Sequence, residues 1–169
     1  MNLDKNQKVL FITDIEYGIE RILQEVTNIQ AENILTIQSY NSVISHPFGE
    51  IMRSVIIAIY EENVKEIFVI GTKDNRTDTK VKLLTQHDTL KDKIQKLEYL
   101  FQNCKPEFTN GSVDDWLIGS NNIEKSVEII RHHPLVPSYV NVRGLIINNY
   151  DEKLSIVDVP TDKTVSSST

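Results

Sequence analysis

The sequence has a single cysteine, Cys104, and no apolar run of the roughly 18 residues that a membrane-spanning helix needs. One thiol cannot form an intrachain disulfide or a metal site built from several thiolates. The first residues, Met1 to Lys8, are polar and lack the apolar core of a signal sequence. These absences predict a cytoplasmic protein without disulfides and without membrane insertion.

Basic residues are outnumbered, because 18 Lys and Arg stand against 24 Asp and Glu, for a net charge of −6. This balance argues against nucleic acid and anionic membranes as partners. A glycine-rich phosphate loop is also missing, since Gly71 stands alone in its segment. With 40% hydrophobic residues, the chain can form one core, and we expect a single domain over residues 1–159. The polar, Ser/Thr-rich residues 160–169 predict a disordered tail.

The chain does contain short apolar runs that alternate with helical repeats. The clearest run is Ile67 to Ile70, which ends at Gly71 and predicts a strand buried on both faces. The predicted strands cover residues 8–13, 33–38, 66–71, 139–147 and 154–159, with a hairpin turn at 148–153 before the last of them. The predicted helices cover residues 16–27, 48–62, one or two segments within 78–104 broken near 87–88, and 112–132.

This order of elements predicts an α/β protein with three layers, α-β-α, around a mostly parallel central sheet. The final hairpin makes the last strand an antiparallel edge strand. Right-handed crossovers place helices on both faces of the sheet. In such sheets, ligands bind just beyond the carboxyl ends of the strands. The candidate site is therefore the loop 72–76 together with Asp14, which follows the first strand.

Several segments resemble the β-class carbonic anhydrases, in particular their short bacterial members. The matching segments are Arg53-Ser54 within the second helix, V-K-E-I-F-V-I-G at 64–71, the run 122–134 ending in I-I-R-H-H-P, and V-R-G-L-I-I at 142–147. Their order and spacing cover roughly residues 8–157. The resemblance implies the family's fold, a homodimer, and a zinc enzyme that hydrates CO₂, a carbonate dehydratase-type lyase.

The first zinc-site motif of that family is Cys-x-Asp-x-Arg, after the first strand. By the resemblance, Asp14 stands at the cysteine position, Glu16 at the aspartate position and Gly18 at the arginine position. In the family, the aspartate and arginine form an orienting pair beside the metal. Gly18 removes the cation of that pair, so Glu16 has no such partner. The favoured interpretation of Asp14 is a helix cap, because its short side chain can accept free N–H groups, with Glu16 solvated or paired with Lys73 or Arg76.

The second motif of the family is His-x-x-Cys, after the third strand. Thr72 stands at the histidine position and Asn75 at the cysteine position, while Asp74 matches the usual residue between them. Catalytic zinc needs three firm protein ligands and one open position, and it lowers the pKa of its bound water to about 7. Thr and Asn offer only neutral oxygens. The sequence therefore predicts a divergent member that lacks the zinc ligands, with no catalytic residue, metal or cofactor assigned.

The favoured interpretation is a catalytically degenerate protein with a binding, scaffolding or regulatory role, whose partner is a small anion or a protein. A first alternative is a divergent carbonic anhydrase with a metal site rebuilt from Asp14, Glu16 or His46. A second alternative is a small-molecule or nucleotide-binding module that uses the loop 72–76. As a lone loop histidine, His46 also fits a surface or capping role, and His132 and His133 suit the negative end of a helix dipole.

Overall fold

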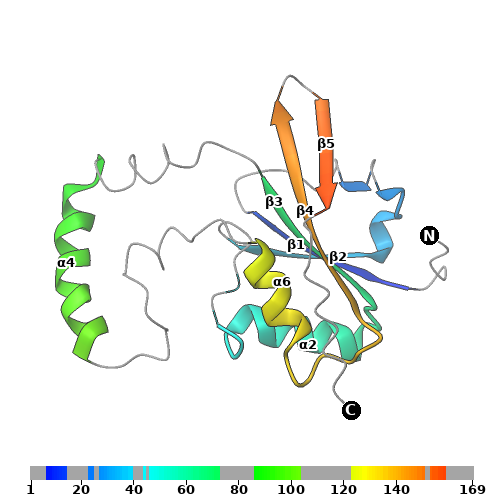
Figure 1. The fold of residues 1–169 in the computed structure, drawn as a ribbon, viewed down its shortest axis with the longest axis horizontal. Helices are drawn as coiled ribbons and strands as arrows, with labels where there is room; N and C mark the ends of the chain where they lie inside the picture. Colours follow the sequence, from blue (N-terminus) through cyan, green and yellow to red (C-terminus); the bar gives the residue numbers. More distant parts are fainter. Residues whose placement is uncertain are drawn as a thin grey trace, which may run out of the picture.

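A five-stranded sheet with the order β2-β1-β3-β4-β5 forms the centre of the protein (Figure 1). The computed structural model describes residues 7–14, 23–24, 27–39, 44, 46–72, 86–103, 123–150 and 153–158. The strands are β1 (Val9–Asp14), β2 (Ile34–Ser39), β3 (Glu66–Thr72), β4 (Asn141–Tyr150) and β5 (Lys153–Asp158). The first four are parallel and β5 is antiparallel to β4, which confirms the predicted sheet.

Apolar side chains cover both faces of the sheet, and all six residues of β1 are buried. Helices α2 (Glu50–Glu61) and α6 (Ile123–Arg131) pack on one face through Met52 and Val127, against Leu10 and Ile12 of β1. On the other face, Phe11 packs in a second cluster that includes Leu23. Leu23 is helical, as are Gln24 and Thr27, the described part of the helix predicted over residues 16–27. Helices on both faces give the predicted three layers.

Two element boundaries differ from the prediction. The second helix begins at Glu50 with Gly49 as its N-cap, so Phe48 lies in the preceding turn and is 77% exposed. The predicted hairpin turn at 148–153 is wrong in extent, because β4 continues to Tyr150 and pairs there with Lys153. The ladder hydrogen bonds extend the strands over polar residues that resemble a turn in sequence.

Two further helical elements complete the described part of the chain. Helix α4 (Asp88–Asn103) begins at the predicted break and stands to one side of the sheet in Figure 1. A short 3-10 helix, η1 (Ala31–Asn33), leads into β2. None of the described helices has the length and apolar character needed to cross a bilayer. The predicted tail, residues 160–169, lies outside the described residues, as does residue range 112–122 of the predicted fourth helix.

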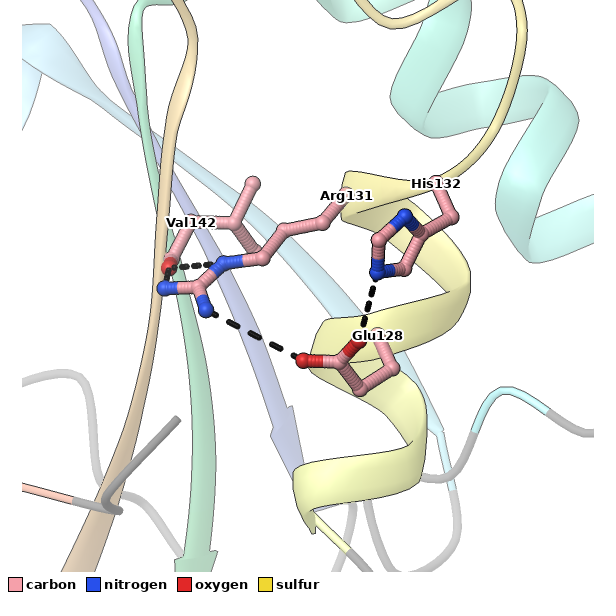
Figure 2. A network of polar contacts seen from close by, with 4 residues as sticks. All are labelled: Glu128, Arg131, His132 and Val142. Atoms are coloured by element: carbon pink, nitrogen blue, oxygen red, sulfur yellow. Dashed lines mark hydrogen bonds and ion pairs between the residues drawn. The ribbon is translucent and has the colours of Figure 1, made fainter. Parts of the chain in front are cut away.

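Arg131, at the end of α6, binds the start of β4 (Figure 2). The Asn141 N–H donates to the Lys65 carbonyl at 2.8 Å, so alternation along the strand turns the Val142 carbonyl away from β3. β5 pairs with β4 only from Leu145 onward. Arg131 donates to the Val142 carbonyl from Nε at 3.1 Å and from Nη2 at 2.6 Å. The guanidinium therefore supplies the partner that an edge carbonyl needs.

Candidate functional site

The carboxyl edge of the sheet brings together the ends of β1, β2 and β3. Asp14 ends β1 and pairs in register with Ser39, which ends β2. β3 runs beside β1 and ends at Thr72. The positions that the resemblance assigned to a zinc ligand in each motif, Asp14 and Thr72, thus lie on adjacent strands at the same edge. The edge is where an open α/β sheet binds its ligands.

Asp14 lies on the face of the sheet that α2 and α6 cover. Side chains alternate along a strand, so Asp14 shares a face with Leu10 and Ile12, which pack against these two helices. Asp14 is 0% exposed and has an interaction partner. The neighbouring Ser39 Oγ is buried and has no hydrogen-bond partner among the described residues. The first candidate position is therefore a carboxyl group enclosed in the protein.

The first residue of α6, Ile123, packs against Gly71 near the carboxyl end of β3. An ideal Cβ placed on Gly71 would lie 2.7 Å from Cδ1 and 2.8 Å from Cγ1 of Ile123, so the isoleucine occupies the space that any larger residue would need. One turn later, the Oγ of Ser126 accepts the N–H of Ile44 at 3.0 Å. Both Ser126 and Ile123 are buried. These contacts fix α6 and the segment that follows β2 against the carboxyl edge.

The structure describes only part of the predicted site. Glu16, Gly18, Asp74 and Asn75 lie outside the described residues, and Thr72 is described as the last residue of β3. Among the described residues, no three or more His, Cys, Asp and Glu side chains gather into a group that could hold a metal ion. Sequence reasoning missed Ser39 and Ser126, because a serine carries no periodic signal and its role depends on strand pairing and helix packing.

His46 lies in a turn in front of α2. Its Nδ1 accepts the N–H of Phe48 at 3.0 Å, so one ring nitrogen closes the turn His46-Pro47-Phe48. The ring also contacts the Phe48 ring, with centroids 5.9 Å apart. This geometry agrees with the capping role that the sequence allowed. A metal could bind only at Nε2 without breaking that hydrogen bond.

Known proteins resemble this chain in sequence and in fold. No protein-family model matches the chain. The chain is 65% identical, over 97% of its length and 94% of the relative's, to "Putative carbonic anhydrase-like protein YbcF" of Bacillus subtilis strain 168. It is 27% identical to "Putative carbonic anhydrase YtiB" of the same organism, over 90% of this chain and 81% of that protein. The chain belongs to the β-carbonic anhydrase family. The resemblance seen in the sequence is thereby confirmed.

Solved β-carbonic anhydrases share the fold. Isoform I from Trichomonas vaginalis superposes with a TM-score of 0.61 at 20% identity, over 94% of this chain and 87% of that one. A carbonic anhydrase from Streptococcus mutans gives a TM-score of 0.57 at 14% identity, over 95% and 87% of the two chains. A structure from a study of two tetrameric β-carbonic anhydrases of Sordaria macrospora superposes with a TM-score of 0.55 at 12% identity, over 93% of this chain and 84% of that one. At these identities the likeness concerns the fold alone.

Proposed function

We propose that this member of the β-carbonic anhydrase family is catalytically degenerate and serves a binding, scaffolding or regulatory role. The observation that supports the proposal is Asp14, which stands at the position of a zinc-binding thiolate. Asp14 is fully buried and has an interaction partner. A catalytic zinc ion must keep one coordination position that water can reach, whereas Asp14 is enclosed in the protein.

The donor atoms at the three ligand positions do not fit the zinc ion of the family. Asp14 offers a carboxylate, and Thr72 and Asn75 offer neutral oxygens in place of histidine and cysteine. Zinc in proteins is held by thiolate, imidazole and carboxylate groups, whereas a hydroxyl and an amide are weak ligands for it. A set with one anionic oxygen therefore lacks the affinity that a resident zinc ion requires. We assign no catalytic step to a metal in this chain.

Metal analysis of the purified protein combined with a CO₂-hydration assay tests this proposal. The wild-type chain is expected to carry no stoichiometric zinc and to leave CO₂ hydration at the uncatalysed rate. The matched control restores the family's residues with the substitutions D14C, E16D, G18R, T72H and N75C. The restored chain should bind about one zinc per chain, because it again offers two thiolates and an imidazole.

Two results would favour the alternatives. Stoichiometric zinc in the wild type, with CO₂ turnover abolished by Asp14→Ala, would indicate a rebuilt metal site and would overturn the degenerate assignment. Thermal stabilisation by nucleotides would instead favour a binding module at the loop 72–76. Asp14→Asn separates the charge of the carboxyl group from its shape, since the two side chains have nearly equal volume.

We further propose that the chain forms a homodimer. A structural neighbour from Sordaria macrospora is tetrameric, and large apolar side chains are exposed on α2 of this chain. Ile57 and Tyr60, three residues apart on α2, are 55% and 58% exposed, and the Tyr60 hydroxyl donates to the Leu135 carbonyl at 2.8 Å. Light scattering during gel filtration should give the mass of two chains. A single-chain mass at all concentrations would contradict the proposal.

A further inference from the structure

Two turns with the sequence His-Pro each place a histidine ring against the ring of Phe48. In the turn before α2, His46 Nδ1 accepts the N–H of Phe48 at 3.0 Å. In the turn after α6, His133 Nδ1 accepts the N–H of Leu135 at 3.1 Å. The Phe48 ring lies 5.9 Å from the His46 ring and 5.6 Å, edge to face, from the His133 ring. Each histidine accepts the N–H two residues on, as Asn does in an Asx turn.

His133 is the buried member of the pair, at 5% exposure. A ring nitrogen that accepts an N–H carries no proton, so the neutral ring holds its single proton on Nε2. Nε2 is buried and has no hydrogen-bond partner among the described residues. An unpaired buried donor is costly, and such groups are rare in native proteins without a reason. The hydrogen bond that Nδ1 accepts from Leu135 and the contact of the ring with Phe48 therefore offset the cost of the unpaired Nε2.

Protonation of His133 would remove the hydrogen bond that Nδ1 accepts from Leu135. The imidazolium carries a proton on both nitrogens, so Nδ1–H would point at the Leu135 N–H that it now accepts. The turn would lose its hydrogen bond and gain two donors in contact. A buried charge without a partner adds a desolvation cost. The protonated ring is thus expected to leave its site and to release both Leu135 and Phe48.

The acidic side chains on the described segments next to His133 contact other cations. Glu128 of α6 binds His132 at 2.7 Å and lies 3.9 Å from Arg131, whose guanidinium donates to Val142. At the start of α2, Arg53 lies 3.5 Å from Glu50. The titratable and charged groups on the neighbouring described segments are His46, Glu50, Arg53, Tyr60, Glu128, Arg131, His132 and Tyr139.

We propose that His133 is a pH-sensitive switch that joins the turn after α6 to both ends of α2. In the neutral state, its ring packs against Phe48 in front of α2, while the same turn presents the Leu135 carbonyl to Tyr60 near the end of α2. In the protonated state, the turn 133–135 opens and these contacts are lost. Closure is favoured at high pH and lost as pH falls.

Amide hydrogen exchange at single-residue resolution tests the switch in the full-length protein. After correction for intrinsic exchange rates, protection of the Leu135 amide should fall about five- to tenfold between pH 8 and pH 5.5, the loss of about one hydrogen bond. Amides of β1, such as Phe11, should stay protected and exclude global unfolding. His133→Asn keeps an acceptor for the Leu135 N–H but cannot be protonated, so its Leu135 protection should not change with pH. His132→Asn, an exposed neighbour, should behave as the wild type.

Parallel pH profiles for the wild type and His133→Asn would overturn the proposal. A measurement on the wild type alone keeps the test independent of that variant's folding. Nitrogen-15 spectra of the histidine rings at pH 8 should show His133 protonated at Nε2 and bare at Nδ1. A proton at Nδ1 at pH 8 would equally refute the switch, because the turn would then not depend on the neutral ring.

Discussion

Replacing Gly71 with alanine tests whether Ile123 closes the carboxyl edge of the sheet. The added Cβ would lie 2.7 Å and 2.8 Å from two carbons of Ile123, whereas ordinary contact begins at 3.4 Å. Ile123 or β3 must therefore move by about 0.7 Å, the difference between 3.4 Å and 2.7 Å, in a region where Ile123 and Gly71 are both buried. Overpacking of this kind costs about 1–3 kcal/mol, so Gly71→Ala should lower the free energy of unfolding by that amount.

A double-mutant cycle with Ile123→Ala isolates the contact. Ile123→Ala alone should cost about 2–5 kcal/mol, because it removes a buried side chain and leaves a cavity. It also removes both carbons that the new methyl group would meet. In the double variant the methyl group occupies part of that cavity, so the loss should be smaller than the sum of the single losses by about 1–3 kcal/mol. Urea unfolding at 25 °C measures all four free energies.

Additive losses, within about 0.5 kcal/mol, would refute the packing derived for Gly71. Gly49→Ala is the matched control, since its Cβ would meet His46 atoms no closer than 3.4 Å. This control should change stability by less than about 1 kcal/mol, the range for an N-cap glycine, and should show no coupling to Ile123→Ala.

Two further substitutions test the contacts that hold α6. Ser126→Ala leaves the buried Ile44 N–H without its acceptor and should cost about 1–3 kcal/mol in urea unfolding; an unchanged midpoint would mean that another acceptor replaces the hydroxyl. Arg131→Met keeps the length of the side chain but removes two donors to the Val142 carbonyl, for an expected loss of about 1–3 kcal/mol. Glu128→Gln neutralises the carboxylate that lies 3.9 Å from Arg131 and 2.7 Å from His132, both contacts being part-exposed, and should cost less than about 1 kcal/mol. An equal loss in Arg131→Met and Glu128→Gln would assign the effect to the ion pair instead.

Much of the fold was predictable because its signals are local. The run Ile67 to Ile70 predicts a buried strand by composition alone, and the strand is observed as part of β3. The errors occurred where the local sequence pattern conflicts with a helix cap or with strand pairing. Phe48 continues the apolar repeat of α2, yet Gly49 caps the helix and Phe48 remains outside it. The polar residues after Ile147 resemble a turn, yet they pair with β5 as far as Tyr150.

The sequence by itself determined which donor groups the chain can offer, because donor type is a property of each residue. The family that it predicted is confirmed, and the placement of the weak donors Thr72 and Asn75 at ligand positions stays a prediction. Only the tertiary structure decided that Asp14 is enclosed, that Ile123 fills the space above Gly71, and that His133 accepts a hydrogen bond in a buried turn. Burial and the direction of a hydrogen bond depend on groups that the fold brings together from distant parts of the chain.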